Sequence, residues 1–363
     1  MNKTKLIESS KRIEAYRPNP TVESIAAGLG VPVKEVFKLD ANENLFLDRS
    51  IMMGILVEAA YETDPRLYPQ DEEESLKHLI AKLNQVKSTQ IVVSAGGDQI
   101  IELIFSLLRW GDSVTAVTPT FSMYSRLARQ RGIKYREASL KPDFSLNVEK
   151  TLRIANDSSV LVVCNPNNPT GNQFSREEIL RLVKGFSGLV LVDEAYQEYS
   201  SYSLVDETAN YENLIILRTF SKAYGLAGLR LGYCISNESL TYTLRERYQL
   251  PYPVPNIVLK TGCRILEKQA LIRESIDKTN VTRAWLIDEL NKLDGVEAFP
   301  SETNFVLFNT DKSYTEVHTV LLSKGILVRK IGKVLGKENC LRVTVAPKPM
   351  LKQFLVSLEE VTK

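Results

Sequence analysis

Short apolar segments that run directly into polar or glycine-containing turns recur through the middle of this sequence. Residues 190–192 are apolar and precede Asp193, residues 160–163 lead into the turn 165–171, and residues 214–217 come shortly before Lys222. A short apolar run bounded by turn residues is typical of a strand buried on both faces of a parallel sheet. Strand-like and helix-like segments alternate from about residue 70 to about residue 240. This alternation predicts an α/β fold with a mostly parallel central sheet flanked by helices.

Lys222 would stand at the mouth of one of these buried strands. A lysine amine there can form a Schiff base with an aldehyde cofactor, and Ser221 and Arg230 can bind a phosphate through a hydroxyl and a planar guanidinium. Pyridoxal 5'-phosphate (PLP) carries both an aldehyde and a phosphate. A Ser-Lys pair seen alone is more often a solvated lysine beside a loop, so the interpretation depends on its companions.

Two strand ends supply partners for the ring of PLP. Asp193 ends a buried-type strand and needs a cation, which a protonated pyridine nitrogen would provide. Tyr196 could reach the phenolic oxygen of the ring, and Asn168 could donate a hydrogen bond from its turn. Seen alone, Asp193 would more often cap a helix or join a structural ion pair, and the turn around Asn168 would be ordinary.

A strand-to-helix switch at residues 90–105 predicts an anion site. Gly96, Gly97 and Asp98 lie at the switch, where backbone N–H groups at a helix start can approach a phosphate closely. Phe121, after the strand-like residues 112–117, could stack on a pyridine ring. Each signal is weak alone, because Asp98 could simply cap the helix and most single aromatic residues belong to a core.

Taken together and in this order, these residues resemble the fold type I PLP-dependent aminotransferases, and within them the histidinol-phosphate aminotransferase family. The resemblance covers nearly the whole chain. The matching segments are Leu39–Asn44, Arg66–Pro69, Pro119–Tyr124, Asn165–Gly171, Asp193–Tyr196, Arg218–Tyr233, Thr303–Leu307, Gly325–Arg329 and Leu341–Val345.

The resemblance implies a role for each matching residue. Lys222 would be the catalytic residue, holding the cofactor aldehyde and then moving the proton between substrate and cofactor. The remaining cofactor contacts would be Asp193 with the pyridinium, Asn168 and Tyr196 with the ring oxygen, Phe121 on the ring face, and Ser221, Arg230, Gly96, Gly97 and Asp98 with the phosphate, joined by Tyr68 from a partner subunit. Arg342, Arg329, Tyr16 and Asn44 would bind the substrate, and no metal is expected.

The resemblance also implies a reaction and an assembly. The expected reaction moves the amino group of L-histidinol phosphate to 2-oxoglutarate, giving glutamate, in a homodimer with its active site between domains at the interface. An aromatic or broad-range aminotransferase and a decarboxylase of threonine phosphate remain open as alternatives. A PLP-binding regulator is disfavoured, because such proteins carry a separate DNA-binding segment for which this chain has no room.

Several positions depart from the usual pattern of the family. Leu45 follows Asn44 where proline is common, residues 97–99 read Gly-Asp-Gln in place of Ser-Asp-Glu, Phe121 replaces a frequent tyrosine, and residues 346–347 are Ala-Pro where a glycine is usual. The phosphate cradle therefore relies more on backbone groups than on a hydroxyl. None of these changes affects Lys222, and the cofactor assignment stands independently of the exact substrate.

Composition agrees with an enzyme that acts on small molecules. The 363 residues carry a formal charge of only +2, so there is no electrostatic case for a nucleic acid or membrane partner. No apolar run is long enough to span a bilayer and the polar start lacks the core of a signal peptide, which predicts a cytoplasmic protein. The four cysteines are widely spaced and read as buried free thiols, and His78 and His318 lie in charged helical stretches where surface positions are expected.

We expect three parts along the chain. Residues 1–40 form an N-terminal arm that packs with the small domain or with the partner subunit, residues 41–250 form the large PLP-binding domain, and residues 251–363 form a small α+β domain. The proline-rich segment 251–255 should be the hinge before a long helix. Helices are predicted at 256–267 and 270–293, and strands at 304–308, 326–329 and 341–345.

Overall fold

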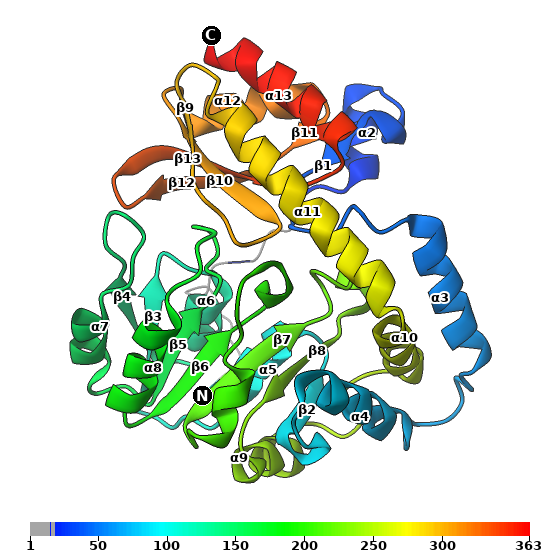
Figure 1. The fold of residues 1–363 in the computed structure, drawn as a ribbon, viewed down its shortest axis with the longest axis vertical. Coiled ribbons are helices and arrows are strands. Elements are labelled where there is room, and N and C mark those ends of the chain that lie inside the picture. Colours follow the sequence, from blue (N-terminus) through cyan, green and yellow to red (C-terminus); the bar gives the residue numbers. More distant parts are fainter. Residues whose placement is uncertain (1–14, 16–18) are drawn as a thin grey trace, which may run out of the picture.

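The computed structural model describes residue 15 and residues 19–363, and its centre is a seven-stranded sheet (Figure 1). The strand order is β2-β8-β7-β6-β5-β3-β4, and β8 is the strand that runs antiparallel to both of its neighbours. The strands are β2 (Ile91–Ser94), β3 (Ser113–Thr118), β4 (Lys134–Ser139), β5 (Val160–Cys164), β6 (Leu189–Asp193), β7 (Leu214–Thr219) and β8 (Gly232–Ile235). The expected α/β fold with a mostly parallel sheet is therefore confirmed.

Helices cover both faces of this sheet, because successive residues of each buried strand point to opposite sides. One apolar cluster joins Val192 and Ile216 to helices that include α4, α8 and α10, and a second joins Leu191 and Leu217 to α5 and α6. The helices around the large sheet are α3 (Arg49–Tyr61), α4 (Glu72–Asn84), α5 (Gly97–Ser106), α6 (Met123–Gln130), α7 (Val148–Ala155), α8 (Arg176–Gly185), α9 (Glu238–Thr243) and α10 (Asn256–Glu267).

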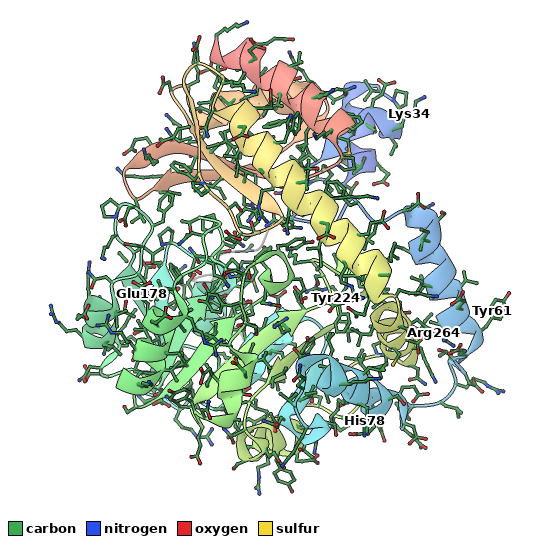
Figure 2. The ribbon with its side chains drawn as sticks, viewed as in Figure 1. Lys34, Tyr61, His78, Glu178, Tyr224 and Arg264 are labelled. Carbon is green, nitrogen blue, oxygen red and sulfur yellow. The ribbon has the colours of Figure 1, made fainter. Side chains whose placement is uncertain are left out.

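Local sequence sets the helix starts on this layer. At the start of α8 the Ser175 hydroxyl accepts a hydrogen bond from the backbone N–H of Glu178, and the Glu178 carboxylate accepts one from the backbone N–H of Ser175, which forms a capping box. His78 projects from α4 into solvent, as its charged surroundings indicated (Figure 2).

A second, smaller sheet lies above the carboxyl ends of the large-sheet strands in the view of Figure 1. It is antiparallel with the order β12-β13-β10-β9, and a separate two-stranded parallel pair joins β1 to β11. The strands are β1 (Phe37–Lys38), β9 (Val296–Ala298), β10 (Phe305–Thr310), β11 (Ile326–Leu327), β12 (Arg329–Val334) and β13 (Lys337–Thr344), and the helices are α2 (Val22–Leu29), α11 (Gln269–Leu290), α12 (Tyr314–Ser323) and α13 (Lys348–Thr362).

The helices and strands predicted for the C-terminal part of the chain are present, and the differences concern residues 326–334. Helix α10 covers the expected residues 256–267 and α11 most of 270–293, but the expected strand 326–329 is divided into β11 and the start of β12 at Val328. Strand β12 continues through Gly332, where the register with β13 shifts, so its apolar residues do not alternate regularly. The limits proposed for the arm and the two domains stay a prediction.

Short helical turns connect several of these helices and strands. They lie at Val33–Glu35, Ser88–Gln90, Gln197–Tyr199, Val205–Ala209 and Ala227–Leu229, with a π-helical turn at Leu244–Tyr248 after α9. Within the described part of the chain, no helix is both long enough and apolar enough to cross a membrane.

Candidate active site

The carboxyl ends of β5, β6 and β7 bring the predicted residues to one edge of the large sheet. Parallel strands end at the same edge, where doubly wound α/β folds bind their ligands. A cavity of about 150 Å³ opens there. It is lined by Gly97, Asp98, Ile101, Phe121, Cys164, Asn168, Asp193, Ala195, Tyr196, Leu217, Thr219, Ser221, Lys222 and Arg230.

A second cavity of about 620 Å³ adjoins the first and extends toward the small sheet. The two share Phe121, Asn168, Tyr196 and Lys222 as lining residues. The outer cavity adds Arg329 and Arg342 from the small sheet, so the two sheets together form one continuous site.

Asp193 lies at the floor of the inner cavity with a buried carboxylate. Its Oδ2 accepts a hydrogen bond of 2.5 Å from the Tyr124 hydroxyl and its Oδ1 accepts one of 3.0 Å from the backbone N–H of Ala195. Burial raises the pKa of Asp193 to about 6, against the effect of these two hydrogen bonds. Among the described residues no basic side chain pairs with this carboxylate, so the site suits a cationic ring nitrogen.

Lys222 lies at the boundary between the two cavities. Its Nζ donates a hydrogen bond of 2.9 Å to the backbone carbonyl of Ala41 and lies 5.7 Å from the centre of the Tyr196 ring. Burial, helped by the positive charges of Arg342 and Arg230, lowers the pKa of Lys222 to about 8. A substantial fraction of the amine is therefore neutral near physiological pH, which is the form that attacks an aldehyde.

The start of α5 and the loop after β7 form an anion-binding end of the inner cavity. Arg230 donates from Nη1 to the Ser221 hydroxyl at 3.3 Å and from Nη2 to Asp98 Oδ2 at 3.1 Å. Gly96 precedes α5 with a φ of +85°, and a Cβ atom at this position would lie 2.8 Å from Arg230 Nη2. The close approach of the guanidinium to the helix N-terminus thus requires glycine, and it gives a phosphate both backbone donors and a positive charge.

The walls of the inner cavity hold aromatic and amide groups. The Tyr196 hydroxyl accepts hydrogen bonds from Asn42 Nδ2 at 2.9 Å and from Asn168 Nδ2 at 3.5 Å. Burial raises the pKa of Tyr196 to about 12, so its hydroxyl stays protonated and can donate to a ring oxygen. Phe121 lines both cavities and meets Tyr124 edge to face, with ring centres 5.7 Å apart.

Arg342 on β13 is a buried cation that faces the outer cavity. It donates from Nη1 to Asn168 Oδ1 at 2.5 Å and from Nη2 to the Asp40 carbonyl at 2.8 Å, while its Nε is buried with no partner. Burial lowers the pKa of Arg342 to about 10. Arg329 lines the same cavity and donates to Asn19 Oδ1 at 3.0 Å. Arg342 and Arg329 thus place two positive charges on the wall of the outer cavity, which suits an anionic group.

Three of the residues expected in the site lie elsewhere or are not described. Asn44 Nδ2 donates to the Ala223 carbonyl at 2.8 Å and to the Ser275 hydroxyl at 3.1 Å, and it lines neither cavity. Tyr68 is 73% exposed and stacks on Tyr252 with ring centres 4.8 Å apart, away from the cavities of its own chain. Tyr16 lies outside the described residues.

Sequence reasoning did not single out Tyr124 and Asn42, although both lie within segments that it quoted. Tyr124 reaches Asp193 across 69 residues of sequence, and Asn42 reaches Tyr196 across 154. Asn42 adopts a left-handed conformation with φ of +55°, a conformation that asparagine tolerates better than most residues. Its place in the polar segment Asp40–Asn44 was the only sequence signal for it.

The described residues fit the parts of PLP by their chemistry. The inner cavity offers an amine of lowered pKa for the aldehyde, a buried carboxylate without a cation for the pyridine nitrogen, and a helix N-terminus with Arg230 for the phosphate.

Comparisons with known proteins agree with this arrangement. The family model for aminotransferases of class I and II matches residues 34–358. The chain is 37% identical over 314 residues to the histidinol-phosphate aminotransferase of Thermoanaerobacter sp. (strain X514), covering 85% of this chain and 88% of that protein. It is 32% identical over 362 residues to the histidinol-phosphate aminotransferase of Bacillus subtilis (strain 168), covering 98% and 99%.

Solved structures show the same fold. A histidinol-phosphate aminotransferase from Sinorhizobium meliloti, in complex with pyridoxal-5'-phosphate, superposes with a TM-score of 0.85 at 22% identity, covering 95% of both chains. An L-threonine-O-3-phosphate decarboxylase from Porphyromonas gingivalis superposes with a TM-score of 0.78 at 25% identity, covering 90% of this chain and 99% of that one.

Proposed function

The chain belongs to the class I and II aminotransferase family, and we propose that it transfers the amino group of L-histidinol phosphate to 2-oxoglutarate in the biosynthesis of histidine. The relatives named above support this donor. The observation that carries the proposal is Arg342, a buried guanidinium whose Nε has no partner and which faces the outer cavity beside Arg329. A planar donor of this kind suits a phosphate in one half-reaction and a carboxylate in the other.

PLP is the cofactor, and when bound it supplies an aldehyde that condenses with amines and a ring that withdraws electrons from the attached carbon. Asp193 would hold a proton on the ring nitrogen, because a buried carboxylate is stabilised by an adjacent cation. Lys222 would first hold the cofactor and then, as a free amine of lowered pKa, take a proton from the amino-bearing carbon of the substrate and deliver it to the cofactor carbon that carried the aldehyde. Arg230, Ser221 and the start of α5 would fix the phosphate.

The residues around the substrate and the ring would set the orientation of the amino donor relative to the cofactor. Arg342 and Arg329 would anchor the anionic group of the donor, which places the amino-bearing carbon toward Lys222 on the boundary of the two cavities. Tyr196 and Asn168 would donate hydrogen bonds to the ring oxygen, and Phe121 would limit movement of the ring from one side.

The likeness to the threonine-phosphate decarboxylase supports a second candidate that also takes a phosphorylated donor. A single-turnover assay separates the candidates: the PLP form is mixed with L-histidinol phosphate, L-phenylalanine or O-phospho-L-threonine, and conversion to pyridoxamine phosphate is followed by absorbance. Fast conversion with histidinol phosphate alone supports the proposal. Equal conversion with phenylalanine would favour a broad-range aminotransferase, and release of carbon dioxide from phosphothreonine would favour the decarboxylase.

A homodimer is part of the proposal. Helix α3 and the segment after it present exposed apolar side chains, namely Ile51, Met53, Val57, Tyr61, Leu67 and Tyr68, and Tyr252 continues the same surface through its stacking on Tyr68. Tyr61 projects from the outer edge of the molecule (Figure 2). On α3, Met53, Val57 and Tyr61 share one face at i, i+4 spacing, which suits a partner subunit, and a partner placed there would let Tyr68 reach the phosphate end of the neighbouring cavity.

Subunit complementation tests this arrangement. Lys222→Ala and Tyr68→Ala proteins are assayed alone and after mixing under conditions that exchange subunits. If Tyr68 acts across the interface, the hybrid contains one site with both residues intact and activity is regained. If the mixture stays as inactive as its components, Tyr68 does not serve the partner's site.

We further propose a cytoplasmic location. The four cysteines are free, three of them buried, as expected in a reducing compartment. Fractionation of the native cells with an antibody against the chain would test it, and recovery outside the cytoplasm would contradict it.

A further inference from the structure

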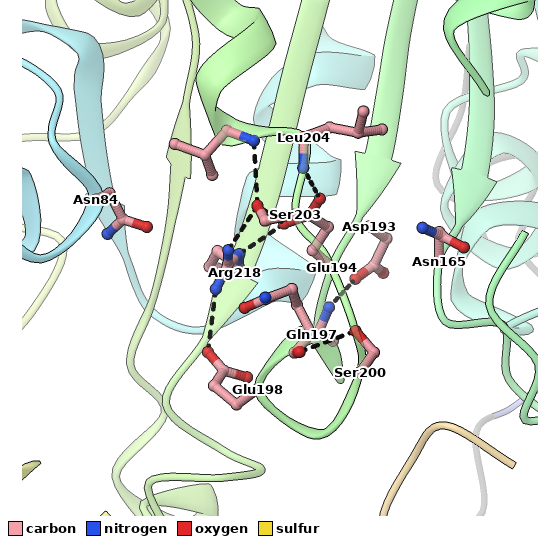
Figure 3. A network of polar contacts seen from close by, with 12 residues as sticks. Asn84, Asn165, Asp193, Glu194, Gln197, Glu198, Ser200, Ser203, Leu204 and Arg218 are labelled. Carbon is pink, nitrogen blue, oxygen red and sulfur yellow. Dashed lines mark hydrogen bonds and ion pairs between the residues drawn. The ribbon is translucent and has the colours of Figure 1, made fainter. Parts of the chain in front are cut away.

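A buried ionic network lies behind the cofactor cavity, on the face of the large sheet that packs against α8 and α10 (Figure 3). Its centre is Arg218 on β7, which is 5% exposed. The guanidinium donates from Nε to Glu194 Oε2 at 2.9 Å, from Nη1 to Glu198 Oε1 at 3.2 Å and from Nη2 to the Ser203 hydroxyl at 2.9 Å. One side chain therefore joins β7, the end of β6, the turn that follows it and a loop beyond that turn.

Glu194 is the most fully paired member of this network. Its Oε1 accepts a hydrogen bond of 2.7 Å from the backbone N–H of Leu204, and its Oε2 accepts one of 2.7 Å from the Ser203 hydroxyl as well as the bond from Arg218. Its side chain has no exposed surface. A buried ion pair contributes little net stability over apolar side chains of the same size, since removing both charges from water is costly. Stability alone is therefore a weak reason for this arrangement.

The network residues alternate along the chain with residues of the cavity. Asp193 and Tyr196 line the inner cavity, whereas Glu194 and Glu198 turn toward Arg218. Arg218 thus holds one residue on each side of Tyr196.

The same alternation holds on the neighbouring strand. Leu217 and Thr219 line the cavity, and Arg218 between them points to the opposite face. Asp193 pairs with Leu217 in the parallel register, and the backbone N–H of Glu194 donates to the Leu217 carbonyl at 2.9 Å. Arg218 and Glu194 are therefore each the immediate neighbour in sequence of a residue that lines the cavity.

We propose that Arg218 is a positioning residue: by gripping Glu194 and Glu198 it fixes residues 193–198 against β7 and sets the orientation of Asp193 and Tyr196 toward the cofactor. The proposal rests on the assignment of the cavity to PLP and is independent of the amino donor. Because Arg218 binds a residue on each side of Tyr196, it restricts the rotation of this short segment more than a single contact could.

The charges of the network also affect the pKa of Asp193 in the cavity. Burial is the main cause of the raised pKa of Asp193, and the charge of Glu194 acts in the same direction. The charged or titratable groups that face Arg218 are Glu194, Glu198, Tyr224 and Tyr233. Removing Arg218 alone would leave both Glu194 and Glu198 without their counter-charge, so the test removes Arg218 together with Glu194, the partner with no exposed surface. Glu198 stays, and because burial already raises its pKa it can become neutral by binding a proton.

The double variant Glu194→Leu/Arg218→Met separates positioning from stability, because it replaces the central ion pair by apolar side chains. The readouts are the thermal midpoint of the PLP-free protein, the dissociation constant of PLP, and the pH midpoint of the visible absorbance of bound PLP, none of which needs a substrate. We expect a folded protein whose PLP dissociation constant rises on the order of tenfold, the effect usual for groups that orient a binding residue. We also expect the pH midpoint to move by about half a unit or more, because the charge of Glu194 is lost and the orientation of Asp193 changes. The Arg218→Lys protein keeps both charges, so a shift in that variant isolates the effect of orientation.

Arg176→Met is the matched control. Arg176 also holds the 203–207 loop with a guanidinium, through the Ser203 carbonyl, Asp206 and Glu207, but it contacts neither strand end. The Arg176→Met change should leave the PLP dissociation constant and the pH midpoint of the bound cofactor unchanged. Arg218→Lys, which keeps the charge but loses the fork, should give an intermediate shift and serves if the double variant does not fold.

The result that overturns the inference is a folded double variant, or a folded Arg218→Lys protein, whose PLP affinity and pH midpoint match the parent. Failure of the parent protein itself to bind PLP would instead overturn the cofactor assignment on which the inference rests, so the two failures are distinguishable.

Discussion

The hydroxyl of Tyr124 donates a 2.5 Å hydrogen bond to Oδ2 of Asp193, and both groups are buried at the floor of the inner cavity. This contact favours the ionised carboxylate, against the burial that disfavours it. It leaves Oδ1 with a single backbone donor, so the two oxygens of Asp193 are held in different ways.

Tyr124→Phe should weaken PLP binding while leaving the fold intact. The ring still packs against Phe121, but Asp193 loses a hydrogen bond and its pKa rises further. A bond to a charged group of this kind contributes about 1.5 kcal/mol, so we expect PLP affinity to fall on the order of tenfold. Titration of the PLP-free protein with PLP, followed by absorbance, measures it; an unchanged affinity would show that the Ala195 N–H suffices.

Asp193→Asn should have opposite effects on the PLP-free and PLP-bound proteins. The folded pKa of about 6 lies above the ordinary value of 3.8, so the folded state binds the extra proton between these values and stability falls as pH rises through this window. Above about pH 6 the PLP-free protein carries this cost in full, and asparagine removes it, a gain on the order of 1–3 kcal/mol.

Denaturant unfolding of both PLP-free proteins at pH 4 and pH 7.5 checks the sign, since the advantage of the variant should appear only at the higher pH. PLP affinity should fall in the same variant. A variant less stable than the parent at pH 7.5 would contradict the buried, unpaired carboxylate.

Lys222→Ala should abolish turnover and the visible absorbance of PLP joined to the protein. The amine is the only described lysine that lines the inner cavity, and its lowered pKa supplies both the nucleophile and the proton carrier. Single-turnover spectra with L-histidinol phosphate measure the loss. Lys184→Ala, an exposed lysine near Tyr211, is the control and should behave as the parent does.

Arg342→Lys should reduce discrimination in favour of phosphorylated donors. Lysine keeps the charge but lacks the planar fork of the guanidinium, so the stabilisation of the transition state with L-histidinol phosphate, measured from the ratio of kcat/KM values, should fall by about 2–5 kcal/mol. Comparing L-histidinol phosphate with unphosphorylated L-histidinol isolates the anionic group, and the ratio of their kcat/KM values should fall toward one. A ratio equal to that of the parent would make Arg342 a structural residue that holds Asn168 and Asp40.

The strands that carry the site could be predicted because their signals are local. Residues 190–192 and 214–217 are apolar on both faces, and a strand buried on both faces ends where polarity returns, which placed Asp193 and Lys222 at the same edge. The resemblance then related Arg230 to the cofactor phosphate and Arg342 to the substrate. Neither the local pattern nor the resemblance shows which distant side chains contact these residues in the folded protein.

Contacts between distant segments could not be read from the sequence. Asn44 and Asn42 are two residues apart in the same polar segment, and only the left-handed turn at Asn42 decides which of them faces Tyr196. The predicted strand 326–329 includes only the first residue of β12, because Gly332 shifts the register of this strand and breaks the alternation on which such predictions depend. The pairing of Glu194 with Arg218 likewise depends on the sheet order, since the two lie 24 residues apart.

Helix α11 has a mechanical consequence for the site. Its first half joins the core of the large sheet through Ile272, and its second half joins the core of the small sheet through Leu286 and Leu290. A helix of 22 residues is a rod of about 33 Å. Because the rod is clamped at both ends, the small sheet cannot tilt toward the large one without bending α11 or loosening one clamp. The stiffness of α11 therefore contributes to the spacing between Arg342 on β13 and the start of α5, at the two ends of the site.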